Sequence, residues 1–198
     1  ARPVRTRMMR DPFVEVVARD ELRQRVAGLG AEITTDYAGR SPILIGVLKG
    51  SIPFLADLVR ELDFELEIEF LGLTHFDGAG QVGLTMDTER SLTGRHVLIV
   101  EEIIDTGLTL ASLHRMIEAR DPASLSTAVL LDKAPRRIVD VPLRYRGFEV
   151  GDEFLLGYGL SWEGRFRNLP SLWAALDLPF LQDHPEEFAR TAYRYGGD

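Results

Sequence analysis

Short runs of branched apolar residues recur along the chain, and polar turns separate them from segments with helical periodicity. Residues 43–48 and 97–100 are apolar throughout, and residues 124–131 end in an apolar run. Such runs predict strands that are buried on both faces. Helix-like segments follow at 53–62 and 110–119. This alternation predicts an α/β fold with a doubly wound, mostly parallel sheet.

The N-terminal part has a rough helical stripe of apolar residues. Asp11 and Pro12 suit the cap and the first position of a helix, which predicts that a helix begins there. Gly28 and Gly30 are expected to end it, and a second helical piece is expected over 31–38.

Other segments have different patterns. Residues 61–70 alternate strictly between acidic and apolar positions, which predicts a half-buried strand with one acidic face. Residues 71–80 contain three glycines and no periodicity, so we expect a mobile loop, followed by a strand at 82–86. A strand is expected at 154–160, and the tail from residue 172 is expected to hold a short helix.

Composition narrows the class of protein. A length of 198 residues indicates one domain. The net charge of −8 argues against a nucleic-acid partner, whose binding surface should be basic. The absence of cysteine excludes disulfides and thiolate chemistry, and the four histidines have no metal-ligand spacing. No apolar run approaches a membrane span, and the arginine-rich first ten residues do not resemble a secretory signal, so we expect a cytoplasmic protein.

The candidate chemistry centres on residues 97–109. The strand at 97–100 is followed by Glu101 and Glu102, then by Asp105 and the turn Thr106, Gly107, Leu108 and Thr109 at the start of a helix. Unpaired N–H groups at a helix N-terminus bind anions, and the threonine hydroxyls add donors. Carboxylates beside such a turn suit a sugar phosphate, because they accept hydrogen bonds from ribose hydroxyls. An ordinary turn with a solvated acidic loop is the alternative.

The string VLIVEEIIDTGLTL at 97–110 resembles the phosphoribosyl-pyrophosphate motif of the type I phosphoribosyltransferases. The nearest branch is the hypoxanthine-guanine phosphoribosyltransferases, which usually have Glu-Asp-Ile-Ile-Asp-Thr/Ser-Gly; Glu102 stands here in place of the second residue, Asp.

Further motifs follow in the order of that family. Leu48-Lys49-Gly50-Ser51 resembles its pyrophosphate loop, in which the peptide bond before the lysine is often cis, although a lone lysine at a turn is usually solvated surface. Lys133, Phe154 and Arg167 match its base-reading lysine, its stacking aromatic and its pyrophosphate arginine; core packing is the alternative for Phe154. Thr74 and His75 replace the usual Ser-Tyr of its mobile loop, and Ser161 replaces an Asp that helps to hold a second magnesium.

The resemblance implies a phosphoribosyltransferase core at about 40–160 with a small hood built from the N-terminal and C-terminal segments. It implies transfer of a phosphoribosyl group from phosphoribosyl pyrophosphate to hypoxanthine or guanine, with Mg²⁺ as cofactor, and a homo-oligomer, a dimer or a tetramer. Transfer to a modified purine and a regulator that senses phosphoribosyl pyrophosphate without turnover are the alternatives. The implied roles are: Asp105 as general base; Thr106 to Thr109 on the 5′-phosphate; Glu101 and Glu102 on the ribose hydroxyls and the metal; Lys49, Gly50 and Arg167 on pyrophosphate; Lys133, Phe154 and Leu155 on the purine.

Overall fold

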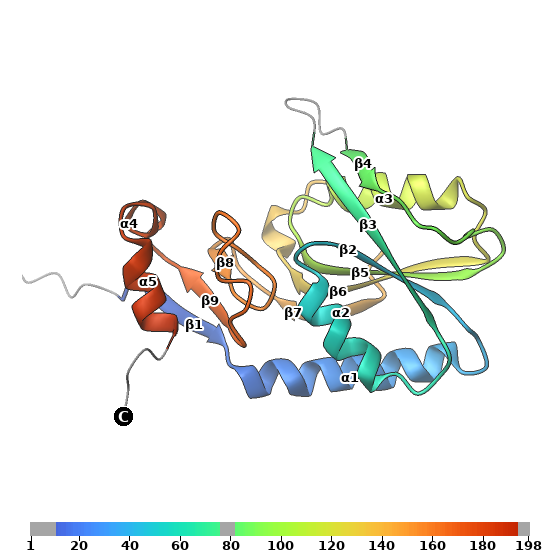
Figure 1. The fold of residues 1–198 in the computed structure, drawn as a ribbon, viewed down its shortest axis with the longest axis horizontal. Coiled ribbons are helices and arrows are strands. Elements are labelled where there is room, and N and C mark those ends of the chain that lie inside the picture. Colours follow the sequence, from blue (N-terminus) through green and yellow to red (C-terminus); the bar gives the residue numbers. More distant parts are fainter. Residues whose placement is uncertain (1–10, 76–81, 194–198) are drawn as a thin grey trace, which may run out of the picture.

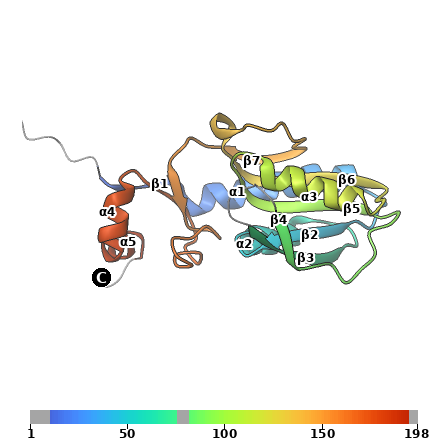
Figure 2. The same cartoon turned by 90° about the horizontal axis from the view of Figure 1, so that it is seen from above.

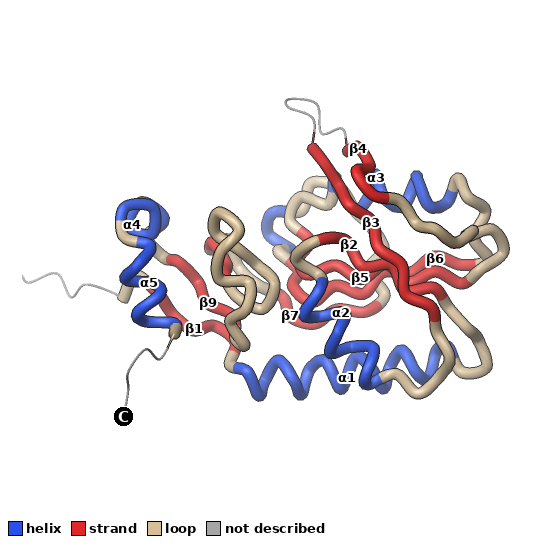
Figure 3. Tube along the Cα trace, in the orientation of Figure 1, coloured by secondary structure: helices blue, strands red, loops and turns tan. Residues whose placement is uncertain are grey.

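A six-stranded sheet forms the larger part of the computed structural model, which describes residues 11–75 and 82–193. Its strand order is β4-β3-β2-β5-β6-β7, and every neighbouring pair is parallel except β3 and β4. Figures 1 and 3 show its strands running side by side. The predicted mostly parallel sheet is therefore confirmed. The strands are β2 (Ile43–Leu48), β3 (Glu67–His75), β4 (Val82–Met86), β5 (His96–Ile104), β6 (Ser124–Asp132) and β7 (Tyr145–Glu149).

Helices cover both faces of this sheet, as a doubly wound fold requires. Helices α1 (Arg19–Tyr37) and α2 (Ile52–Leu58) lie below the sheet in Figure 1, and α3 (Leu108–Glu118) lies above it. Successive side chains of a strand point to opposite faces. Leu44 accordingly packs in the core cluster with α1 and α2, whereas Ile43 and Ile45 pack in the cluster with α3.

A second, antiparallel sheet has the order β1-β9-β8 and lies beyond the end of the main sheet in Figure 2. Its strands are β1 (Phe13–Val17), β8 (Phe154–Leu156) and β9 (Leu172–Ala175). Helices α4 (Leu178–Asp183) and α5 (Pro185–Ala192) accompany it. Phe13, Leu156 and Phe188 belong to its own apolar cluster. The division of the chain into a core and a hood stays a prediction.

The predicted helix start at Asp11 and Pro12 is wrong. Residues 13–17 form β1, which pairs with β9, and α1 begins only at Arg19. The cap signal is local, whereas the partner strand comes from the far end of the described chain. Gly28 and Gly30 do not end the helix, which continues to Tyr37. A Cβ at Gly30 would lie 2.4 Å from the Glu61 Cβ, so the glycine allows close approach of the 3-10 turn Val59–Glu61.

The strand predicted at 61–70 begins only at Glu67, because its partner β2 begins at Ile43, opposite Glu67. Its acidic face is paired in part: Glu67 accepts a hydrogen bond from Arg95 at 2.8 Å. The loop predicted at 71–80 is also wrong over its first half, since residues 71–75 continue β3. The remainder of that loop lies outside the described residues.

Several predicted boundaries differ at the C-terminal side. The strand expected at 154–160 stops at Leu156, because residues 157–160 form a turn closed by the Leu160 N–H donating to the Gly157 carbonyl at 3.0 Å. Strands β7 and β9 have no counterpart among the predicted elements, and the tail has two helices, not one. The strand predicted at 97–100 extends to Ile104, so Glu101 and Glu102 lie within it.

Candidate active site

Strand β5 and helix α3 meet at a turn that only glycine can form. Gly107 is the N-cap of α3 and has φ +88°, in the left-handed region. A Cβ there would lie 2.6 Å from the Val139 carbonyl oxygen. The N–H groups of Ile138 and Val139 donate to the Thr106 carbonyl at 3.0 and 3.1 Å, which fixes the turn. The first N–H groups of α3 consequently open toward the carboxyl end of β5.

A cavity of about 230 Å³ lies at this turn. It brings together five of the nine residues predicted to hold phosphoribosyl pyrophosphate. Leu108, which is 40% exposed, lies outside its lining, as do Lys49, Gly50 and Arg167. The predicted residues on its wall are Glu101, Glu102, Asp105, Thr106, Gly107 and Thr109.

Glu101 and Glu102 form a buried carboxyl pair. The Glu101 side chain is almost fully enclosed, and burial raises its pKa well above the ordinary value, with repulsion from Glu102 adding to the effect. Burial also raises the pKa of Glu102, but the positive charge of Arg167 opposes this rise. Burial and the repulsion between the two carboxylates therefore favour a protonated form of the pair.

The pair suits a hydroxyl donor or a divalent cation. Glu102 Oε2 is buried and has no hydrogen-bond partner, which leaves an acceptor directed at a ligand. No group of three or more acidic or histidine side chains that could hold a metal occurs within 11–75 and 82–193. A cation here would take only part of its coordination from the protein, which is the usual arrangement for magnesium on phosphate substrates.

The lysine turn after β2 lies against this pair. The Leu48–Lys49 peptide bond is cis, as in the family that the motif resembles, and the Lys49 side chain is exposed. A Cβ at Gly50 would lie 1.8 Å from Glu102 Oε1, so any other residue here would displace the Glu102 carboxylate. A Cβ at Gly159 would lie 2.0 Å from the Gly50 carbonyl oxygen, and Arg167 Nη1 donates to the Gly159 carbonyl at 2.5 Å. Three predicted pyrophosphate contacts thus converge at one edge of the sheet.

A second cavity, of about 470 Å³, holds the residues predicted to bind the purine, which are Lys133, Phe154 and Leu155, together with Asp105 and Ser161. Lys133 is buried, and its Nζ donates to the Glu153 carbonyl at 2.8 Å. Phe154 packs edge-on against Trp162 with ring centroids 5.5 Å apart. Part of the Phe154 ring is thereby covered within the protein, while the residue still lines the cavity.

Two parts of this cavity are absent from the sequence-based prediction. Arg136 Nε lies 2.6 Å from Asp105 Oδ1, and its Nη1 lies 2.8 Å from Asp152 Oδ1. Arg136 stands only three positions after Lys133 in the sequence, so its nearness to the predicted purine site could have been inferred from the sequence. An apolar wall of Ala175, Leu176 and Leu178 comes from β9 and the start of α4, and nothing local in the sequence indicates it.

Thr74 and His75 do not lie in a loop, contrary to the prediction. They end β3, where they are paired with Gly83 and Val82 of β4. Their predicted role in closing over the site also concerns residues 76–81, which lie outside the described ones. Among the described residues, no helix is long and apolar enough to cross a membrane.

Comparison with known proteins agrees with this geometry. The phosphoribosyl transferase domain family matches residues 15–162. A hypoxanthine-guanine phosphoribosyltransferase of Streptococcus pneumoniae is 43% identical over 159 residues, which are 78% of this chain and 88% of that protein. The enzyme of the same name from Bacillus subtilis is 40% identical over 168 residues, 82% of this chain and 93% of that protein.

A crystal structure of a hypoxanthine-guanine phosphoribosyltransferase from Bacillus anthracis superimposes with a TM-score of 0.79 at 37% identity, covering 81% of this chain and 95% of that one. The fold and the site define a phosphoribosyltransferase. Within that class, the chain belongs to the hypoxanthine-guanine phosphoribosyltransferase family.

Proposed function

We propose that the chain transfers the phosphoribosyl group of phosphoribosyl pyrophosphate to hypoxanthine or guanine in purine salvage. The observation that carries the proposal is that the two cavities share Ile103 and Asp105. A sugar phosphate in one cavity and a planar base in the other would meet at this boundary. The names of the relatives support the same substrates.

The phosphoribosyl cavity holds the donor substrate. The N-terminus of α3 and the Thr106 hydroxyl bind the 5′-phosphate, and Glu102 accepts from the ribose hydroxyls through its unpartnered oxygen. Lys49 and Arg167 neutralise the pyrophosphate as the bond from ribose C1 to its oxygen breaks and pyrophosphate leaves with the electron pair.

The second cavity holds the purine. Its ring stacks on Phe154, its 6-oxo group accepts from Lys133, and backbone groups at Leu155 contact its edge. Asp105 takes the proton from an imidazole nitrogen of the purine as the ring forms its bond to ribose C1. Arg136 holds Asp105 at the boundary through their 2.6 Å ion pair.

Mg²⁺, if bound, would supply positive charge that stabilises the negative charge developing on pyrophosphate. Glu101 and Glu102 would hold it from the protein side, and Ser161, which lines the purine cavity, offers only a neutral hydroxyl at the second metal position.

Product identification tests the function. The protein is incubated with phosphoribosyl pyrophosphate and magnesium, and separately with hypoxanthine, guanine, adenine and a modified purine. We expect IMP and GMP with release of pyrophosphate, and almost no product from adenine. Turnover with the modified purine alone would assign another base, and the absence of transfer to any base would overturn the proposal.

A cytoplasmic location and a homo-oligomeric state belong to the same proposal. Light scattering of the purified protein distinguishes a dimer or tetramer from a monomer.

A further inference from the structure

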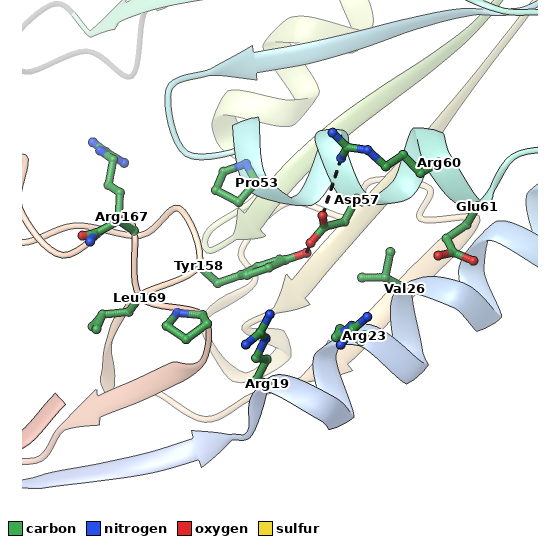
Figure 4. Close-up of a pocket in the computed structure, with 12 residues that line it drawn as sticks. Arg19, Arg23, Val26, Pro53, Asp57, Arg60, Glu61, Tyr158, Arg167 and Leu169 are labelled. Atoms are coloured by element: carbon green, nitrogen blue, oxygen red, sulfur yellow. Dashed lines mark hydrogen bonds and ion pairs between the residues drawn. The ribbon is translucent and has the colours of Figure 1, made fainter. Parts of the chain in front are cut away.

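A cleft of about 440 Å³ lies between α1, α2 and the segment 158–170 (Figure 4). Its walls carry four arginines and two acids: Arg19, Arg23, Arg60, Arg167, Asp57 and Glu61. Only Arg167 has a role in the proposed reaction. The cleft is therefore separate from both substrate cavities, with which it shares no lining residue among those described.

Two of the arginines have no partner within the described part of the protein. Arg19 and Arg23 are one helical turn apart, so both lie on the face of α1 that lines the cleft. Neither has an ion pair or a side-chain hydrogen bond to any residue of 11–75 or 82–193. Like charges at this spacing repel each other. An anion in the cleft would relieve that repulsion.

The acids leave the cleft with excess positive charge. Asp57 accepts a hydrogen bond from the Tyr158 hydroxyl at 2.6 Å. Its Oδ1 also lies 3.8 Å from Arg60 Nη1, and a dashed line in Figure 4 marks this ion pair. The negative charge of Asp57 is therefore balanced by Arg60 within the wall of the cleft. Among the described residues, Glu61 is the one other acid on the wall, and it balances only one of the two charges of Arg19 and Arg23. This excess arises in a chain whose net charge is −8, so it is a local feature of the cleft.

The floor of the cleft is apolar and aromatic. Tyr158 is buried, and Pro53, Val26, Leu169 and Pro170 lie around it. Planar apolar groups pack well on such a floor. The ring of Tyr158 is held by its bond to Asp57, so the floor exists before any ligand binds.

We propose that this cleft binds a phosphorylated small molecule with a planar apolar part, as a second ligand site beside the active site. Arg19 and Arg23 contact its phosphate groups, and the floor at Tyr158 contacts its planar part. Because Arg167 lines the cleft and is also the arginine proposed to contact pyrophosphate, an occupant competes with pyrophosphate for the charge of this arginine.

The test is calorimetric titration with inorganic tripolyphosphate in a buffer without divalent cations. Wild type is compared with Arg19→Gln/Arg23→Gln and with the control Arg40→Gln/Arg190→Gln, which removes the same charge from exposed positions off the cleft. We expect two classes of binding in wild type and control. The cleft class should weaken at least about tenfold in the double variant, because two charge-assisted contacts are lost. Higher salt should weaken it further.

A Lys49→Ala variant separates the cleft from the active site. It should lose the active-site class and keep the cleft class, since Lys49 does not line the cleft. Equal binding by Arg19→Gln/Arg23→Gln and its control would overturn the proposal, and so would loss of all tripolyphosphate binding in Lys49→Ala. Failure of the transfer assay would leave these titrations unaffected, so the two proposals are tested independently.

Discussion

At the scale of single residues, Asp105 is the side chain on which the reaction depends, because it lies at the boundary of both cavities. Asp105→Asn keeps its size and removes its basicity. We expect turnover to fall by roughly 10²–10⁴-fold. Binding of phosphoribosyl pyrophosphate should stay largely intact, because Asp105 is only one of several residues on that wall. Rapid kinetics with hypoxanthine, together with equilibrium binding, measures both quantities. Unchanged turnover would remove Asp105 from the chemistry.

Lys133 is expected to select the base. Its ammonium has only donors, so the 6-oxo group of hypoxanthine or guanine can accept from it, whereas the amino group of adenine cannot. An unsatisfied buried polar group costs about 1–3 kcal/mol, which corresponds to roughly ten- to hundredfold discrimination. Lys133→Ala should lose kcat/KM for hypoxanthine and guanine without a comparable gain for adenine. A variant equal to wild type on hypoxanthine would exclude Lys133 as the reader of the purine.

Glu101 shows the opposition between stability and function. Its folded-state pKa is raised, so the native protein holds a proton that the unfolded chain releases as pH rises above the ordinary glutamate value. Stability is therefore lost as pH rises from about 4.3 toward the folded pKa. Glu101→Gln should raise the Tm at pH 7 and change it much less near pH 4, where Glu101 is protonated in the folded protein and mostly protonated in the unfolded chain.

The gain at pH 7 should increase with the size of the pKa shift, by about 1.4 kcal/mol for each unit. The same variant should bind magnesium phosphoribosyl pyrophosphate more weakly, because a carboxylate beside the ligand is lost. Thermal unfolding at the two pH values checks the first effect. A Tm that does not change at either pH would contradict the raised pKa.

At the scale of elements, the turn between β5 and α3 depends on Gly107. Gly107→Ala places a side chain at φ +88° and 2.6 Å from the Val139 carbonyl oxygen. We expect a loss of about 2 kcal/mol or more in unfolding free energy, with a raised KM for phosphoribosyl pyrophosphate as the helix start shifts.

Gly94→Ala is the matched control, since Gly94 has φ +70° and a Cβ added to it would meet no atom within 4 Å. It should cost only the conformational strain, about 1–2 kcal/mol, and should leave KM unchanged. Denaturant unfolding and initial-rate kinetics of the two variants separate strain from the clash. Equal effects of both substitutions on KM would show that the tight approach to Val139 does not matter.

At the scale of the whole molecule, the small sheet supplies one wall of the purine cavity and none of the phosphoribosyl cavity. Its cluster centres on Phe188, which is fully buried and lies edge-on to Phe13 and Phe166 at centroid distances of 4.9 and 4.8 Å. Phe188→Ala should destabilise this cluster by about 3–5 kcal/mol.

Because the damage falls on one cavity, the KM for hypoxanthine should rise more than the KM for phosphoribosyl pyrophosphate. Phe54→Ala is the control. Phe54 is equally buried, but it belongs to α2 and packs in the apolar cluster of the main sheet. Steady-state kinetics in both substrates would show the contrast. Equal increases in the two KM values for Phe188→Ala would mean that the small sheet does not serve the purine cavity separately.

The sequence by itself determined the central strands of the main sheet and the order of the motifs. Buried parallel strands are continuous apolar runs, and the residues of a βα turn are neighbours along the chain, so the strand at Ile43–Leu48 and the turn at Thr106 and Gly107 are both predictable. The grouping of Glu101, Glu102 and Asp105 follows for the same reason, and the structure places all three on one cavity wall.

Only the tertiary structure decided the elements whose partners are distant. Strand β1 carries a local signal for a helix start, while its pairing with β9 joins opposite ends of the described chain. The contact of Arg136 with Asp105, the apolar wall at Leu176 and the arginine cleft likewise join side chains from separate elements. Local sequence patterns predict structure that depends on residues close together in the chain. These sites form only when elements that are distant in the sequence pack against each other.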